Sequence, residues 1–92
     1  MKVERLETKF GNLSTNQVVI IDKDKITFQS YVTKIAVLKD STVTLGICWD
    51  CSHTTIRYLY QFLREYARLT VHSKKDVFRY ADKGKIMFTK RF

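Results

Sequence analysis

The chain has 92 residues, of which 45% are hydrophobic and 28% charged, a composition that can bury one modest core and excludes an intrinsically disordered chain. Residues 1–10 lack the apolar segment of a signal peptide, and the longest uncharged stretch, Ser41 to Trp49, is far short of the ~20 apolar residues that span a bilayer. The net charge is +8, with 7 Lys/Arg against 6 Asp/Glu in residues 1–50 and 10 against 3 in residues 51–92. We therefore expect one soluble, cytoplasmic domain, residues 1–92, whose C-terminal half attracts anionic partners.

The first half of the chain has the pattern of β-structure. Met1 to Lys9 fits an edge strand or a short helix, of which we favour the strand, and turn formers follow in residues 11–16. Polar turns are predicted at residues 22–25 and 39–41, and Gly46 is typical of a bulge or a close backbone approach. The further strands predicted here are Gln17 to Asp22, Ile26 to Tyr31, Thr33 to Leu38 and Thr42 to Trp49.

The second half changes to helical spacing. Apolar residues recur at steps of three and four from Thr54 to Leu69, which predicts a long helix with Ser52 as its N-cap. A shorter helix is predicted from Lys74 to Lys83, with Ser73 as N-cap and Gly84 as the stop. Its predicted inward residues are Val77, Phe78 and Ala81.

A closing strand is predicted from Ile86 to Thr89. The predicted fold class is therefore α+β: an antiparallel sheet of four to five strands packed by one long and one short C-terminal helix.

Cationic side chains are predicted on the outer face of both helices. On the long helix, steps of four, three and four residues stack one row on the exposed face, and Tyr58 lies at its edge. If the helices pack side by side, the two rows form one basic surface. The candidate binding residues are Arg57, Tyr58, Gln61, Arg64 and Arg68 on the long helix, and Lys74, Lys75, Arg79 and Lys83 on the short one; the tail adds Lys85, Lys90 and Arg91.

Cys48 and Cys51 are expected to be free thiols or a local pair. Their position just before a helix N-terminus, which would lower a thiol's pKa, allows a redox interpretation, but the chain lacks the βαβ order of thioredoxin-like proteins. A zinc interpretation would add His53 and His72 as ligands. The spacing matches no recognised zinc motif, so we favour Cys48 as small apolar filler of the core and expect no metal and no cofactor.

Motifs of known catalytic sites are not found in the sequence. There is no G-x-S-x-G elbow, no Gly-rich phosphate loop and no spaced pair of carboxylates. Asp50, Ser52 and His53 are neighbours in sequence and do not have the arrangement of a catalytic triad. We therefore expect a binding protein and not an enzyme.

Two stretches, residues 28–37 (FQSYVTKIAV) and 49–63 (WDCSHTTIRYLYQFL), carry a family resemblance. Their patterns S-Y-x-T-x-I-A and W-D-x-S-x-T-T-x-x-Y resemble a family of small uncharacterised proteins of bacteriophages and related mobile elements. The resemblance covers residues 28–64 and implies a context, the cytoplasm of a host bacterial cell, but no functional residues.

Small phage proteins of this size often bind and disable a host machine, such as a restriction or CRISPR defence. The function expected from the resemblance and the charge is binding, and inhibition, of a host protein or nucleoprotein complex through the basic helix face, without membrane contact. The alternatives are direct binding of DNA or RNA through that face and a small zinc-binding domain.

Overall fold

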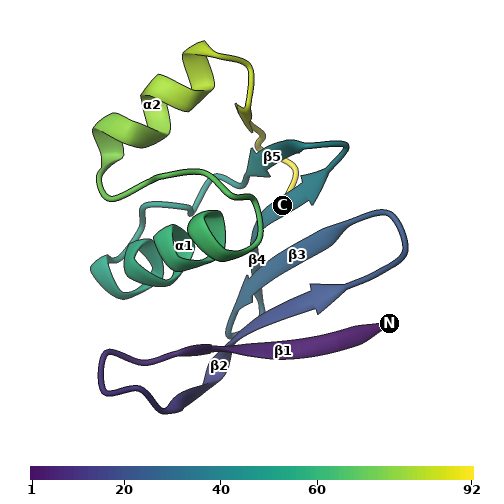
Figure 1. The fold of residues 1–92 in the computed structure, drawn as a ribbon, viewed down its shortest axis with the longest axis vertical. Coiled ribbons are helices and arrows are strands. Elements are labelled where there is room, and N and C mark those ends of the chain that lie inside the picture. Colours follow the sequence, from purple (N-terminus) through teal and green to yellow (C-terminus); the bar gives the residue numbers. More distant parts are fainter.

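The computed structural model describes residues 1–92 and has six strands and two helices (Figure 1). The predicted α+β class is confirmed, but the strands number six where four to five were expected. The elements in chain order are β1 (Lys2–Glu7), β2 (Leu13–Ile21), β3 (Ile26–Ser30), β4 (Thr33–Lys39), β5 (Thr42–Leu45), α1 (His53–Glu65), α2 (Lys74–Asp82) and β6 (Ile86–Phe88). Neither helix has the length and apolar character needed to cross a membrane.

All six strands form one sheet in the order β1-β2-β3-β4-β5-β6. The first five strands are antiparallel neighbours because short turns join them. After β5 the chain passes through both helices before it forms β6, which pairs with β5 in parallel. The predicted turn between β4 and β5 is confirmed: Asp40 and Ser41 have φ values of 52° and 64°, as a type I′ hairpin requires. The strands number six because both edge segments, β1 and β6, pair with the sheet.

Two strand boundaries differ from the predicted ones by four residues. β2 begins at Leu13, four residues before the predicted start at Gln17, because β1 continues to pair with it up to Glu7. β5 ends at Leu45 and not at Trp49. There the Gly46 N–H donates to the carbonyl of Ile35 at 2.7 Å, and the chain then turns away from the sheet.

Both helices begin at the predicted serine N-caps. The Ser52 hydroxyl accepts from the Thr55 N–H at 3.1 Å, and the Ser73 hydroxyl accepts from the Asp76 N–H at 3.4 Å. Each bond satisfies an amide that the first helical turn leaves free. The predicted stop at Gly84 is also confirmed, since Gly84 has a φ of 76° just after the end of α2.

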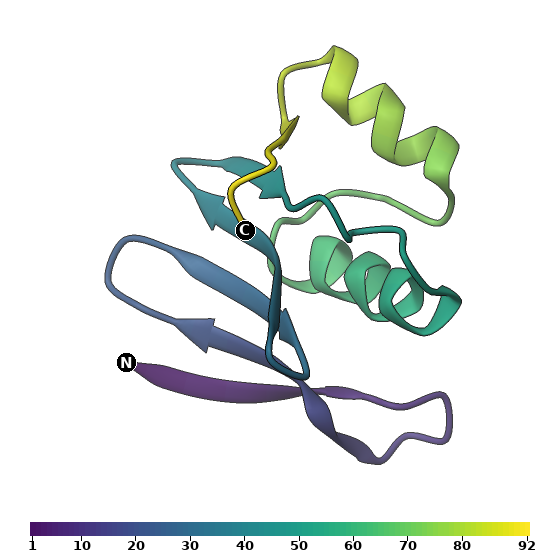
Figure 2. The same cartoon turned by 180° about the vertical axis from the view of Figure 1, so that it is seen from behind.

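The core lies between the sheet and the helices, which occupy the same side of the sheet in both views (Figures 1 and 2). α1 supplies the largest share of it and α2 a single fully buried residue, Val77. The Phe62 ring stacks on Phe28 of β3, with centroids 5.8 Å apart, and on Tyr66 at 5.6 Å. α1 is therefore fixed to the sheet more firmly than α2.

Candidate functional site

The predicted cationic row on α1 is only partly present. Arg57 and Arg64 both lie on the exposed face of α1, two turns apart. The Arg57 guanidinium lies 4.4 Å from the ring centroid of Tyr58, a cation–π contact. The Arg64 guanidinium donates to the carbonyl of Val71 at 2.8 Å, so it ties α1 to the loop that follows. Of the two arginines, Arg57 has the freer donors.

The prediction that Arg68 belongs to this row is wrong. α1 ends at Glu65, and Arg68 lies in the following loop with a φ of 59°. The Leu69 N–H donates to the carbonyl of Leu63 at 2.9 Å, which folds the chain back over the end of the helix. Tyr66 continues the apolar spacing of α1, which predicted a longer helix. It lies just after the last helical turn, where its ring stacks on Phe62.

Two further members of the predicted row serve the fold. Tyr58 is 5% exposed, so the prediction that its ring is available for stacking is wrong. The Gln61 amide, in the orientation that satisfies both of its polar atoms, donates to the Glu7 carbonyl and accepts from the Glu7 N–H at 3.0 Å each. Gln61 thus fastens α1 to the end of β1.

The cations of α2 have different surroundings from one another. Lys74 contacts Asp50 at 3.5 Å, and Arg79 contacts Asp76 at 3.2 Å. Lys83 lies over the Tyr80 ring at 5.7 Å, and Lys75 is exposed without an acidic partner. α2 packs against β6, whereas α1 packs against β1 and β3, so the two helices that carry these cations lie over different strands of the sheet (Figure 1).

Next to these cations lies an aromatic cluster that the sequence did not reveal: Trp49, Phe78 and Phe88. Each pair of rings has centroids 6.0 Å apart, with interplanar angles of 78°, 44° and 35°. Phe78 is 52% exposed, so the prediction that it faces inward is wrong, and Phe88 is 46% exposed. The three rings come from the loop after β5, from α2 and from β6. The cluster is therefore a partly open surface feature that only the tertiary fold creates.

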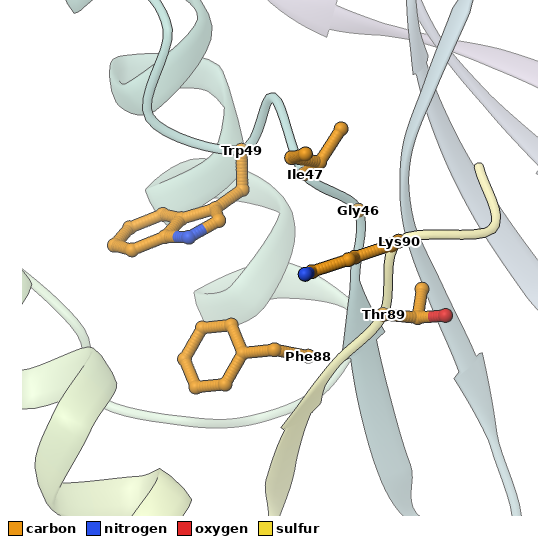
Figure 3. A pocket seen from close by; sticks show the side chains of 6 residues that line it. All are labelled: Gly46, Ile47, Trp49, Phe88, Thr89 and Lys90. Carbon is orange, nitrogen blue, oxygen red and sulfur yellow. The ribbon is translucent and has the colours of Figure 1, made fainter.

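A cavity of about 300 Å³ adjoins the cluster (Figure 3). We call it the aromatic pocket. The Lys90 side chain extends across it, with its ammonium directed toward the space between Trp49 and Phe88 (Figure 3). The residues that line the pocket are Gly46, Ile47, Trp49, Phe88, Thr89 and Lys90.

Backbone hydrogen bonds hold the walls of the aromatic pocket. The Trp49 N–H donates to the Gly46 carbonyl at 3.1 Å, and the Thr89 N–H donates to the Leu45 carbonyl at 2.9 Å, which continues the pairing of Leu45 with Phe88. The predicted close approach at Gly46 is confirmed, because a Cβ there would lie 2.8 Å from the ring of Phe92. The loop after β5 and the segment after β6, which form the walls of the pocket, are thus both held by backbone hydrogen bonds.

The redox interpretation of the cysteines is not supported by their surroundings. Cys48 and Cys51 are free, and the hydrogen bond that the Cys51 thiol makes to Cys48, followed by burial and by the charges of Cys48 and Asp50, raises the pKa of the Cys51 thiol. This shift keeps Cys51 protonated, so Cys51 is not an activated thiol.

The geometry also does not support the zinc interpretation. Cys51, His53 and His72 line one depression between the N-termini of α1 and α2. No three His, Cys, Asp or Glu side chains anywhere in the chain come together as a metal site.

The chain belongs to the family described as "Family of unknown function (DUF8033)", which matches residues 1–79. No curated protein and no solved structure matches the chain. The matched residues include Trp49 and Phe78 and stop before Phe88 and Lys90.

Proposed function

We propose that this member of the DUF8033 family is a non-catalytic binding protein that docks on an anionic macromolecular partner through its C-terminal half. The observation that carries the proposal is that most of the positive charge in this half is not neutralised by ion pairs. Of the ten Lys/Arg in residues 51–92, only Lys74 and Arg79 contact a carboxylate within 4.0 Å. The other eight are all exposed, and we call them the C-terminal cations: Arg57, Arg64, Arg68, Lys75, Lys83, Lys85, Lys90 and Arg91.

An excess of unpaired cations raises the local potential and speeds encounter with an anionic surface. The resemblance to small phage and mobile-element proteins supports a host protein or nucleoprotein complex as the partner. Under this proposal, docking holds the host complex in an inactive state. The most specific version of the proposal is that this complex is a host defence complex.

Charge reversal tests the proposal with a matched control. One variant carries Arg57→Glu, Lys75→Glu and Lys85→Glu. The control carries Lys9→Glu, Lys23→Glu and Lys25→Glu, three exposed lysines of the N-terminal half without ion pairs, so that the change in net charge is the same. Retention on heparin and capture of partners from bacterial lysate, with and without nuclease, are compared between the two variants.

We expect the C-terminal variant to leave heparin at clearly lower salt and to lose the captured partner, while the control keeps both. Partners that survive nuclease are proteins, and partners that disappear were bridged by nucleic acid. Equal losses in both variants would show that only net charge matters, and the proposed docking half would be abandoned.

A further inference from the structure

We propose that the aromatic pocket binds an unpaired base of a single-stranded nucleic acid. This inference rests on the proposed function, because it names the anionic partner that the C-terminal cations attract. It uses a part of the molecule, the cluster of Trp49, Phe78 and Phe88, that electrostatics alone does not involve.

The first argument is the availability of aromatic surface around a hollow. Phe88 is 46% exposed, Phe78 is 52% exposed and Ile47, at the edge of the pocket, is 60% exposed. Three neighbouring apolar side chains left open to water are typical of a binding site and not of an ordinary surface. Every base offers a flat π face, so an open aromatic ring in a hollow can stack on it without reading sequence.

The second argument is rigidity. Trp49 is 7% exposed, and it packs edge-on against Phe78 at 78° with the Lys74 ammonium 5.9 Å from its ring centroid. Phe88 is held by the parallel pairing of β6 with β5. Rings that are already fixed lose little conformational entropy when a ligand stacks on them.

The third argument is charge at the pocket itself. The Lys90 ammonium points between Trp49 and Phe88 and has no carboxylate within 4.0 Å, since none of the four ion pairs of the chain involves it (Figure 3). Lys85 and Arg91 lie on the same segment, before and after β6. A stacked base carries its phosphates within reach of such cations, and aromatic rings interleaved with cations are the usual arrangement in proteins that bind single strands.

The fourth argument is size. A cavity of about 300 Å³ is at the small end of ligand sites and suits one planar ring system. The bases of a duplex are stacked and paired, so their faces cannot enter such a pocket. The geometry therefore favours an unpaired strand over a double helix.

The single tryptophan of the chain reports directly on this pocket. The fluorescence of Trp49 is measured while the full chain is titrated with oligo(dT) of about 20 nucleotides, a length that covers one or more binding sites of this kind. The same titration is made with the corresponding duplex and with polyglutamate of similar total charge. We expect oligo(dT) to quench Trp49, and the duplex and polyglutamate to bind more weakly and leave its emission unchanged.

Variants separate stacking from charge. Phe88→Leu keeps an apolar side chain but removes the ring, and we expect it to weaken oligo(dT) binding about tenfold. Phe10→Leu, at an exposed phenylalanine on a distant hairpin, is the matched control and should change nothing. Ile47→Glu places a carboxylate at the exposed edge of the pocket and should also weaken binding. Because Ile47 is 60% exposed, this change should not disturb the core. Lys90→Gln should reduce the slope of log K against log salt by about 0.7, as expected for one lost phosphate contact.

Each other outcome overturns the inference. The strand would be shown to lie elsewhere if oligo(dT) binds without quenching Trp49. The same would follow if oligo(dT) binds Phe88→Leu and Ile47→Glu as tightly as the parent chain. Equal quenching by polyglutamate would assign the pocket to an acidic protein segment, and equal quenching by the duplex would remove the preference for an unpaired base. In these cases the proposed function still stands if reversal of Arg57, Lys75 and Lys85 abolishes binding. If that reversal has no effect on any probe, the proposed function fails as well.

Discussion

The five antiparallel strands and the segment that follows them use their side chains in different ways. Residues 1–45 carry seven Lys/Arg and five Asp/Glu, whereas residues 46–92 carry ten and four. The strands contribute a regular ladder from β1 to β5, while the later segment holds the aromatic cluster, the aromatic pocket and the C-terminal cations. Under the proposed function, the strands supply a scaffold and residues 46–92 supply the binding surface. Substitutions in either region test how far the two regions depend on each other.

The largest effect is expected where the regions share a core. Phe62→Ala removes the ring that stacks on Phe28 of β3, and it should lower the free energy of unfolding by about 3 to 5 kcal/mol, the usual cost of a large cavity. Chemical denaturation followed by circular dichroism measures it. Phe10→Ala, at a ring that is 79% exposed, is the control and should cost less than about 0.5 kcal/mol. A small effect of Phe62→Ala would mean that the scaffold is stable without α1.

The next effect concerns the two helices of the later segment. Ser52→Ala and Ser73→Ala each remove an N-cap and should each cost about 1 kcal/mol. Ser52→Asp and Ser73→Asp keep an acceptor and should restore most of the loss. Because α2 packs mainly on β6 and buries only Val77, we expect Ser73→Ala to increase hydrogen exchange in α2 and β6 more than in β1 to β4. Equal increases throughout the sheet would show that the two regions unfold as one unit.

The features that local chemistry determines were predictable from the sequence. Ser52 and Ser73 cap the helices, Gly84 ends α2, and the turn at Asp40 and Ser41 lies where polar residues interrupt two β-branched runs. In each case the residue type and its immediate neighbours carry the physical cause. Most of the fold class follows from such local rules.

The features that depend on distant segments were not predictable. The end of α1 is set by the return of the chain, which buries Val71, while the apolar spacing in the sequence continues past Glu65. Consecutive residues of a helix can both be buried, as Phe62 and Leu63 are in α1, so periodicity alone does not show that α2 buries Val77 and leaves Phe78 exposed. The aromatic cluster requires β6 to return beside β5, which no local signal encodes.

A hydrogen bond between the two regions gives a pH-dependent effect. The Tyr66 hydroxyl donates to the Glu4 carboxylate at 2.6 Å; this bond is the main cause that lowers the pKa of Glu4, and burial with the bond raises the pKa of Tyr66. A carboxyl group whose pKa is lowered on folding stabilises the protein at pH values above its pKa in the unfolded chain, about 4.3. This contribution is lost as pH falls through the pKa of the folded state.

Tyr66→Phe should therefore be less stable than the parent chain near neutral pH, and the difference should shrink as pH falls below about 4, where Glu4 becomes protonated in both states. The raised pKa of Tyr66 acts at the other end: its contribution is present below about 10 and is lost as pH rises through the folded value. Thermal unfolding of both proteins across this pH range measures the difference. Tyr31→Phe, at an exposed hydroxyl, should match the parent at every pH.

The smallest effect is expected at Gly46, where the two regions meet. In Gly46→Ala the new methyl group would lie 2.8 Å from the Phe92 ring and 3.3 Å from the Lys34 carbonyl, so the ring must move and lose its contact with the Lys34 ammonium at 5.5 Å. The Phe92 side chain is 37% exposed and has room to move, so we expect a cost of only about 0.5 to 1 kcal/mol. In a Phe92→Ala background the same change should cost less, because only the carbonyl contact remains. A double-mutant cycle from denaturant unfolding measures the coupling. If the costs are additive, Phe92 does not pack on Gly46, and the aromatic pocket has one restraint fewer.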